Sequence, residues 1–453
     1  MSDTATAVAE LSKTFAGGLL LPDAPGYDDA RRVHNGLVDR RPALIARCRG
    51  TADVADAVRL GRTLGLEIAV RGGGHNVGGR ATVDGGLMID LADMRGVHVH
   101  AGTRRAVVQG GATWKDVNRE SQLHALATTG GVVSSTGVAG LTLGGGFGWL
   151  MPKYGMATDN LEAATLVLAD GSVVRATPDE HPDLYWAIRG GGGNFGVATE
   201  LVFTLHPVGP TVTGGLVAWP VERAPEVLRF YRDFTADLPD EIFVATALLT
   251  APDGTKLVGI AAGHCGPLDE GEGQVAPIKA FGSPVMDAMG PMPYSALNAM
   301  LDDAFPKGAR YYWKSHFLEE LGDDAIDTVV DAFASCPSPM GQMLIEGFHG
   351  AGARVPVEST AYAMRVQGYN TLVLAEWLEP SQDEANIAWA RGAYAAIRPF
   401  GGAHRYMNYL DNDDAGQDAL VASYGPNLAR LREVKRKYDP DNLFHLNLNV
   451  PPA

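Results

Sequence analysis

The sequence predicts an α+β fold in two parts: a glycine-rich part suited to binding a cofactor, and a part built on an antiparallel sheet. Three glycine-rich loops lie between short predicted strands in the first 205 residues. After Pro207-Val208-Gly209-Pro210 the pattern changes to longer strands that alternate with helices. This change favours an antiparallel sheet with helices packed on one face, and we place a domain boundary at this segment.

The composition and charge of the chain argue against several classes of protein. Of its 453 residues, 46% are hydrophobic and 20% are charged, which is typical of a globular protein of two or three domains. The 53 Asp and Glu residues outnumber the 37 Lys and Arg residues, and this negative balance argues against nucleic acid or an anionic membrane as a partner. The three cysteines, Cys48, Cys265 and Cys336, are too few and too far apart for a disulfide framework or a cysteine metal site.

The N-terminal residues predict no export signal. Residues 1–11 lack the basic stretch and apolar run that a signal peptide needs, and no apolar run of about 18 residues could cross a bilayer. We therefore expect a cytoplasmic protein without a membrane partner. No heptad pattern marks an interface, so the sequence leaves the oligomeric state open.

The first glycine loop spans residues 70–79 and reads VRGGGHNVGG. A helix over residues 51–64 and a strand over residues 66–70 precede it, and a further strand ending near residue 91 follows it. Glycines packed this closely let backbone N–H groups converge on an anion such as a diphosphate. Because a strand and not a helix follows the loop, the Rossmann dinucleotide fingerprint is disfavoured.

His75 is the unusual residue of this loop. A glycine turn that only held phosphate would gain little from an imidazole. Beside a bound flavin, a nucleophilic ring nitrogen could instead form a covalent bond to the methyl group of the flavin ring. The alternative is a structural glycine turn with an incidental histidine.

Two further glycine regions follow in the first half of the chain. Short strands over residues 87–91, 97–100 and 106–109 predict an antiparallel sheet, and a helix over residues 114–122 leads to the second region, residues 128–160. That region suits a backbone wrapped around an extended ligand, or alternatively a tightly turned sheet edge. It has no Lys-Ser/Thr after its glycines, so it is not a P-loop. A hairpin at Asp170-Gly171 and a third loop over residues 189–197, closed by a strand, complete this half.

Arg71-Gly72-Gly73-Gly74-His75-Asn76 resembles the flavin-attachment loop of the berberine bridge enzyme-like FAD-linked oxidases, which belong to the vanillyl-alcohol oxidase (PCMH-type) superfamily. The three loops, over residues 70–205, follow the order of that family's FAD-binding domain. The resemblance implies an FAD carried covalently by His75. It also implies an FAD-binding domain at residues 1–208, a substrate-binding domain at residues 209–400 and a return to the FAD domain at residues 401–453.

The resemblance also implies which residues hold the cofactor. They are Arg71, Gly72, Gly73, Gly74, His75, Asn76, Gly79, Ser135, Thr136, Gly137, Gly140, Thr142, Gly144, Gly145, Gly148, Asn160, Gly196, Val197, Asn447 and Asn449.

The chain departs from the family at one cofactor position. Doubly anchored members carry a cysteine on the second glycine loop that bonds the flavin, and Val133 stands at the aligned position here. Valine cannot form a thioether, so we expect a single covalent link, as in the singly linked bacterial members. Thr136 matches a position that controls oxygen access in the family, and a threonine there leaves oxidase or dehydrogenase behaviour open.

The second part of the chain predicts the elements of a substrate domain. Helices are expected over residues 225–234, 319–335, 383–397 and 416–438, and the aromatic run Tyr311-Tyr312-Trp313-Lys314 could wall a pocket or pack in the core. Strands are expected over residues 214–219, 242–249, 257–263, 342–348 and 371–378.

Three residues are candidates for a catalytic proton acceptor: Tyr406, Tyr409 and Glu346. The Tyr-x-Asn-Tyr pattern at residues 406–409 resembles the family's C-terminal segment, which implies that both tyrosines lie near the reactive edge of the flavin. Period-two alternation places Glu346 on one strand face with Leu344 and Phe348, where apolar neighbours would raise the pKa of its carboxyl group. The alternatives are a solvent-facing edge carboxylate for Glu346 and a packed aromatic for Tyr409.

The other histidines show no HExxH spacing, and we expect no metal. His349, next to the Glu346 strand, is a further candidate for substrate contact. We expect an FAD-dependent oxidoreductase that removes a hydride from a small alcohol or amine and is reoxidised by molecular oxygen. A flavin dehydrogenase, an oxidative cyclase and a flavin-binding protein without turnover are the alternatives, and no local motif identifies the substrate.

Overall fold

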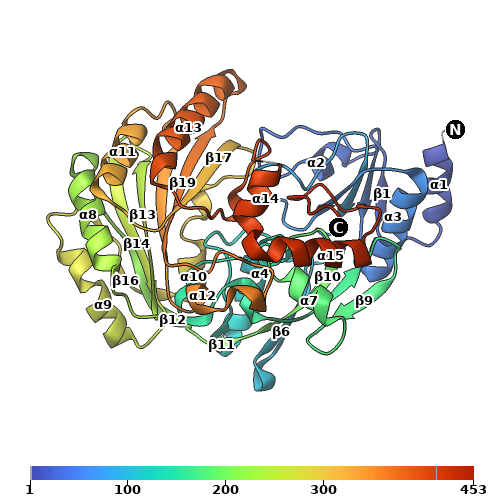
Figure 1. The fold of residues 1–453 in the computed structure, drawn as a ribbon, viewed down its shortest axis with the longest axis horizontal. Helices are drawn as coiled ribbons and strands as arrows, with labels where there is room; N and C mark the ends of the chain where they lie inside the picture. Colours follow the sequence, from blue (N-terminus) through green and yellow to red (C-terminus); the bar gives the residue numbers. More distant parts are fainter. Residues whose placement is uncertain (1–2, 415) are drawn as a thin grey trace.

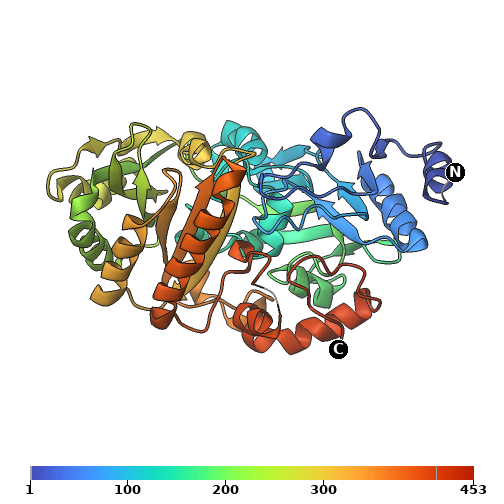
Figure 2. The same cartoon turned by 90° about the horizontal axis from the view of Figure 1, so that it is seen from above.

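The computed structural model describes residues 3–414 and 416–453. Two regions lie side by side in it (Figure 1). One region holds the N-terminal strands together with the last two helices, and the other is a large sheet with helices along its outer side. Figure 2 shows the same division from above, with the outer helices on the side away from the blue N-terminal strands. In the part of the chain that the structure describes, no helix is long and apolar enough to span a bilayer.

A four-stranded sheet carries the first glycine loop. Its central strand β4 (Leu87–Asp90) runs parallel to both of its neighbours, β2 (Leu44–Arg47) and β3 (Ile68–Arg71), and β1 (Gly18–Leu20) forms an edge. Helix α3 (Thr51–Leu64) connects β2 to β3, as the sequence predicts. The prediction that residues 87–91 join the following antiparallel sheet is wrong, because the long glycine loop lets β4 return between β2 and β3, where all its residues are buried.

Two short helices at the N-terminus flank this sheet. Helix α2 ends at Arg31, and the chain is extended at Arg32. Their bounds are α1 Asp3–Leu11 and α2 Tyr27–Arg31.

A five-stranded antiparallel sheet in the order β5-β6-β10-β8-β9 follows. The predicted hairpin at Asp170-Gly171 is confirmed as β8 and β9. The strands are β5 Val97–His100, β6 Arg105–Gln109, β8 Leu161–Val167, β9 Val173–Ala176 and β10 Val197–Thr204. The helices around them are α4 Trp114–Ser121, α5 Val138–Leu143, α6 Met151–Tyr154 and α7 Pro182–Ile188, and the small pair β7 Leu126–Ala127 and β11 His206–Pro207 closes this part.

The large sheet of the second region is antiparallel, in the order β15-β12-β14-β13-β18-β19-β17, with β16 paired to β12. Four helices cover one face, as predicted, and share one apolar cluster with it. The strands are β12 Thr211–Pro220, β13 Ile242–Thr250, β14 Lys256–His264, β15 Met286–Asp287, β16 Gly290–Pro293, β17 Arg310–Leu318, β18 Gln342–Phe348 and β19 Gly368–Trp377. The covering helices are α8 Ala224–Thr235, α9 Leu268–Ala280, α11 Asp323–Ala334 and α13 Asp383–Ile397, and two small helices are α10 Tyr294–Ala299 and α12 Ala351–Arg354.

The alternation predicted for β18 is confirmed. Met343 and Ile345 face the covering helices and belong to the cluster that these helices share with the sheet. Leu344 and Glu346 face the other way, toward the glycine loops of the first region. The open face of the sheet therefore meets the loops, and the space between them is the cavity described below.

The last helix predicted from the sequence is two helices in the structure, α14 (Gln417–Tyr424) and α15 (Leu428–Tyr438). The break falls at Gly425-Pro426, where Gly425 has a φ of 46° and Pro426 has no N–H to continue the helix. Both helices pack on the apolar cluster of the first region. The buried Lys435 then fixes the tail, because its ammonium group donates to Asp439 and to the carbonyl of Phe444.

Candidate active site

A deep cavity separates the glycine loops from the open face of the large sheet. Its empty volume, counted with the space at its mouth, is about 1790 Å³. Its lining comes from the glycine loops, from the C-terminal segment and from the large sheet, so both regions of the chain contribute to it.

The first two glycine loops touch through their backbones. A Cβ atom on Gly73 would lie 2.4 Å from the backbone nitrogen of Gly137, which no side chain could accommodate. Gly74 has a φ of 70°, a conformation that glycine adopts without strain. Gly140 differs from these, since a Cβ there would meet nothing within 4 Å and the residue borders open cavity. The glycines thus bring two loops into contact and leave bare backbone facing the cavity.

Many of the residues expected to hold the cofactor line this cavity, and they come from all three glycine loops and from the C-terminal segment. They are Gly72, Gly73, Gly74, His75, Asn76, Thr136, Gly137, Gly140, Gly144, Gly196, Val197 and Asn447.

Other expected cofactor residues lie behind the lining. Arg71 forms a buried bidentate pair with Asp90, at 2.8 and 2.5 Å, which fixes the start of the first loop against β4. Asn160 donates to two backbone carbonyl groups and bonds His206, so its side chain is occupied within the fold. The expected cofactor residues that are not among the lining residues are Arg71, Gly79, Ser135, Thr142, Gly145, Gly148, Asn160 and Asn449.

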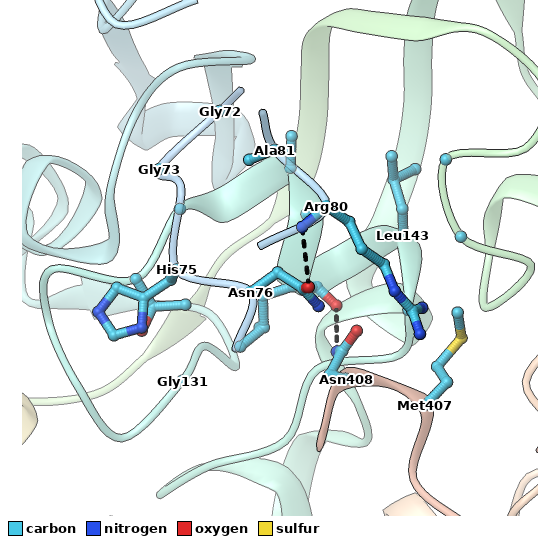
Figure 3. A pocket seen from close by; sticks show the side chains of 18 of the residues that line it. Gly72, Gly73, His75, Asn76, Arg80, Ala81, Gly131, Leu143, Met407 and Asn408 are labelled. Carbon is cyan, nitrogen blue, oxygen red and sulfur yellow. Dashed lines mark hydrogen bonds between the residues drawn. The ribbon is translucent and has the colours of Figure 1, made fainter. Parts of the chain in front are cut away.

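His75 stands at the end of the glycine run and borders the cavity (Figure 3). Its Nε2 atom lies 3.0 Å from the hydroxyl of Ser135, and its ring stacks on the ring of His34 with centroids 3.7 Å apart. Burial, together with the nearby His34, lowers the pKa of His75 to about 3. The ring is therefore neutral at physiological pH, with Nδ1 as the nitrogen not engaged by Ser135.

Glu346 is the buried carboxylate of the sheet side of the cavity. It is 3% exposed on a central strand, so the edge-carboxylate alternative is wrong. The Tyr409 hydroxyl donates to its Oε1 atom at 3.1 Å, and the Asn370 amide donates to Oε2 at 2.8 Å. Burial raises the pKa of Glu346 to about 7, although both hydrogen bonds act to lower it.

The two candidate tyrosines have different surroundings. Burial raises the pKa of Tyr409 well above its ordinary value, and the Glu346 charge raises it further, so this phenol stays protonated at neutral pH. Tyr406 lies beside it, with ring centroids 5.0 Å apart, and accepts a hydrogen bond from Asn408 at 2.9 Å. Of the three candidates, Glu346 is the group that can take up a proton near neutral pH.

The walls around Glu346 are apolar and aromatic. Trp313 from β17 lies edge-on to Tyr409, with ring centroids 5.7 Å apart, so the aromatic run at 311–314 does contribute to the pocket. His349 is not among the lining residues, and its Nε2 atom lies 3.1 Å from the carbonyl of Ile242. The apolar lining consists of Leu301, Phe305, Trp313, Leu344, Leu372 and Leu374.

Arg80 is a lining residue that the motifs did not identify. Its backbone N–H donates to Asn76 Oδ1 at 3.4 Å, and its side chain extends along the cavity (Figure 3). Its guanidinium donates to the carbonyl of Asp411 but makes no ion pair within the described residues. A largely buried cation without a counter-ion fits an anionic ligand. The signal in the sequence was weak, because Arg80 follows the glycine run and belongs to no motif.

No group of three His, Cys, Asp or Glu side chains that could hold a metal ion occurs in residues 3–414 and 416–453. His98 and His100 lie close together on β5, with ring centroids 4.5 Å apart, and gather no third ligand.

Comparison with known families and structures identifies the cofactor. Residues 42–177 match the model of an FAD binding domain, and residues 405–451 match the berberine and berberine-like model. The (R)-6-hydroxynicotine oxidase of Paenarthrobacter nicotinovorans is 34% identical over 455 residues, which cover 97% of either chain.

Two solved structures resemble the whole chain. The crystal structure of 6-hydroxy-D-nicotine oxidase from Arthrobacter nicotinovorans has a TM-score of 0.88 at 32% identity and covers 97% of this chain and 99% of its own. Glucooligosaccharide oxidase from Acremonium strictum, with a 6-S-cysteinyl, 8α-N1-histidyl FAD, has a TM-score of 0.88 at 26% identity and covers 100% of both chains. These matches confirm the predicted PCMH-type FAD-binding domain joined to an antiparallel-sheet domain.

The cavity fits FAD on its own chemistry. The bare backbone at Gly72, Gly73 and Gly140 allows close approach of an extended dinucleotide, and Arg80 supplies a cation for its diphosphate. His75 and Glu346 border the same cavity, one on its loop side and the other on its sheet side.

Proposed function

Because the chain belongs to the berberine bridge enzyme-like FAD-linked oxidases, we propose that it oxidises a small alcohol or amine, with a flavin held covalently by His75 and reoxidised by molecular oxygen. The observation that carries this proposal is the placement of His75 and the buried pair of Glu346 and Tyr409 around one cavity. FAD, when bound, accepts the hydride from the substrate. The chain's own residues attach the cofactor, hold the substrate and take up its proton.

His75 forms the covalent link in this proposal. Its Nε2 atom is engaged by Ser135, so Nδ1 would be the nitrogen that attaches the flavin. Attachment would release one proton from the imidazole and one from the flavin methyl group, and molecular oxygen would take up the electron pair left on the ring system. Val133 lines the cavity at the position of the family's second link and offers no sulfur, so the attachment is single.

Glu346 takes up the substrate's O–H or N–H proton. With a pKa of about 7 it is partly ionised at neutral pH, which matches a general base to its working range. Tyr409 and Asn370 each donate to one carboxylate oxygen, and these bonds fix its orientation. The leucines and aromatic rings around this acid favour a substrate with an apolar body and one hydroxyl or amino group.

Thr136 lines the cavity beside Gly137, which supports the expectation that it controls the approach of oxygen to the flavin. A threonine there is compatible with an oxidase and with a dehydrogenase that uses another acceptor. The relatives named oxidases favour the first. Peroxide production decides between them.

The test is anaerobic reduction of the bound flavin by a panel of hydrophobic amines, alcohols and sugars. We expect bleaching with an amine or alcohol that carries an apolar body, and release of one H2O2 per turnover when air is admitted. Glu346→Gln should bleach far more slowly with the same compound while it keeps its flavin. Absence of bleaching across the panel would contradict the proposal, and bleaching without peroxide would make the protein a dehydrogenase.

A further inference from the structure

Residues 34–36 lie between the first glycine loop and strand β17 of the large sheet. The backbone N–H of His34 donates to the carbonyl of Gly74 at 3.0 Å, directly before His75. The carbonyl of His34 accepts a hydrogen bond from the backbone N–H of Gly308 at 2.9 Å. This short segment, which belongs to no helix or strand, therefore joins the flavin-attachment loop to the other region.

Asn35 strengthens the same connection. Its side-chain amide donates to the carbonyl of Val77 and to the carbonyl of Tyr311, each at 2.8 Å. Its Oδ1 atom accepts from the backbone N–H groups of Leu37 and Tyr311, each at 2.9 Å. All these bonds are made to backbone groups, so they hold the backbone of residues 34–36 against the glycine loop and β17.

The ring of His34 is 6% exposed and lies parallel to two other rings. The His75 ring is 3.7 Å away between centroids with an interplanar angle of 22°, and the Tyr311 ring is 5.2 Å away at 23°. The Tyr311 hydroxyl donates to the carbonyl of Pro306 at 2.7 Å, so the outermost ring is fixed as well. The three rings form a series that ends on the residue proposed to carry the flavin.

We propose that His34 is the positioning residue for covalent attachment of the cofactor, because its ring holds the His75 ring with Nδ1 free and directed to the flavin. This inference rests on the proposed function and deepens it. His75 sits among Gly72, Gly73 and Gly74, and a loop of glycines does little to fix the rotation of its own side chain. The hydrogen bond between Nε2 and the Ser135 hydroxyl constrains one ring atom, and the stack constrains the plane.

The geometry assigns His34 a positioning role and not that of a proton acceptor. The N–H bonds of an imidazole lie in the plane of its ring, so two parallel stacked rings cannot pass a proton directly between them. The Nε2 atom of His34 is buried and makes no hydrogen bond within the described part of the chain. Stacking and shape are therefore what this side chain contributes to His75.

The experiment measures how fast flavin becomes resistant to acid. The full chain is produced in riboflavin-limited cells, incubated with FAD in air, and precipitated with acid at intervals, and the flavin in the pellet is quantified. His34→Gln keeps polarity and removes the ring, so we expect attachment about 2- to 13-fold slower than in the unmodified chain. His34→Phe keeps a ring and removes the nitrogens, and should attach flavin at nearly the original rate.

Two controls separate attachment from folding and from loading. His316→Gln removes another buried histidine ring, which stacks on Tyr394 at 5.7 Å on the far side of the sheet, and should leave attachment unchanged. Total flavin bound before acid treatment shows whether a variant loads the cofactor, and thermal unfolding shows whether it folds.

The outcomes separate this inference from the function it rests on. Slow attachment in His34→Gln with rescue in His34→Phe supports the positioning role. Equal rates for His34→Gln and the unmodified chain overturn it, and so does an equal loss in both His34 variants, which would make the nitrogens and not the stack responsible. If the unmodified chain holds no acid-resistant flavin, the covalent link of the proposed function itself is wrong.

Discussion

The Tyr409 hydroxyl lies 3.1 Å from Glu346 Oε1 and donates a hydrogen bond to it, so the C-terminal segment meets the central strand β18 of the large sheet at this point. The pair combines a carboxyl group that titrates near neutral pH with a phenol that does not. Each then has a distinct effect on the pH dependence of the enzyme.

The rate of flavin reduction at limiting substrate should rise with pH through about 7, because the ionised form of Glu346 accepts the proton and burial raises its pKa to about 7. Glu346→Gln should lower this rate by about 10²- to 10⁴-fold and remove the pH dependence near 7. Stopped-flow reduction between pH 5.5 and 9 measures both. An unchanged profile in the variant would assign the proton transfer to another group.

The same carboxyl group should make the folded protein less stable as pH rises. Its pKa is raised from 4.5 to about 7 in the fold, so its stabilising effect is complete below pH 4.5 and is lost as pH rises through 7. The loss amounts to at most about 3 kcal/mol of unfolding free energy, from 1.36 kcal/mol per pKa unit. Denaturant unfolding at pH 5 and pH 8 should show Glu346→Gln gaining stability relative to the unmodified chain at the higher pH.

Tyr409→Phe should shift the rate profile to higher pH. The tyrosine hydrogen bond stabilises the ionised carboxylate, so its removal raises the pKa of Glu346 further. At pH 7 the rate should fall by about 10- to 100-fold, the loss expected for a hydrogen bond to a charged group. Tyr406→Phe is the matched control, because that hydroxyl bonds Asn408 and not Glu346. Equal profiles for the two variants would argue against the pairing.

His75→Ala should bind flavin that washes out completely in acid. Val133 provides no second covalent link, so no flavin should stay in the pellet. Ser135→Ala is the companion variant: the residue bonds Nε2 but is not the attachment site, and it should retain covalent flavin. Acid-resistant flavin in His75→Ala would reveal an attachment point elsewhere.

Arg80→Met should weaken the non-covalent binding of FAD. Measured in the His75→Ala chain, the dissociation constant should rise by about 10- to 100-fold, because a charge-assisted contact to the diphosphate is lost. Arg105→Met is a control of the same chemistry, since that arginine pairs with Glu162 on the five-stranded sheet. Fluorescence titration measures the dissociation constant of FAD in each variant. Relative to the His75→Ala chain, this constant should rise for Arg80→Met and stay unchanged for Arg105→Met.

Local patterns in the sequence predicted those helices and strands whose formation depends on residues close together in the chain. Two-residue alternation identified both the bounds and the cavity face of β18, and helix α13 was predicted over the residues it occupies. The pattern failed where pairing depends on distant segments. Strand β4 was assigned to the wrong sheet, and one helix was predicted across Gly425-Pro426, where the chain turns.

The candidate site shows the same division. His75, Glu346 and Tyr409 could be identified because each sits in a motif or on a patterned strand. His34, Asn370 and Arg80 could not, because their roles come from contacts with other elements: a stack, a cross-strand hydrogen bond and an unpaired charge. None of these contacts produces a recognisable pattern of residue spacing in the sequence.

The bonds of Asn35 to Val77 and Tyr311 have a consequence for assembly of the protein. The hydrogen bonds of Asn35 to Tyr311, and the third ring of the series, form only when β17, from the second half of the chain, has docked against residues 34–36. The proposed covalent capture of the flavin would then come late, after both halves have been synthesised and have met. The amount of acid-resistant flavin would accordingly report the fraction of molecules in which the two halves have docked. Misassembled chains would hold no acid-resistant flavin.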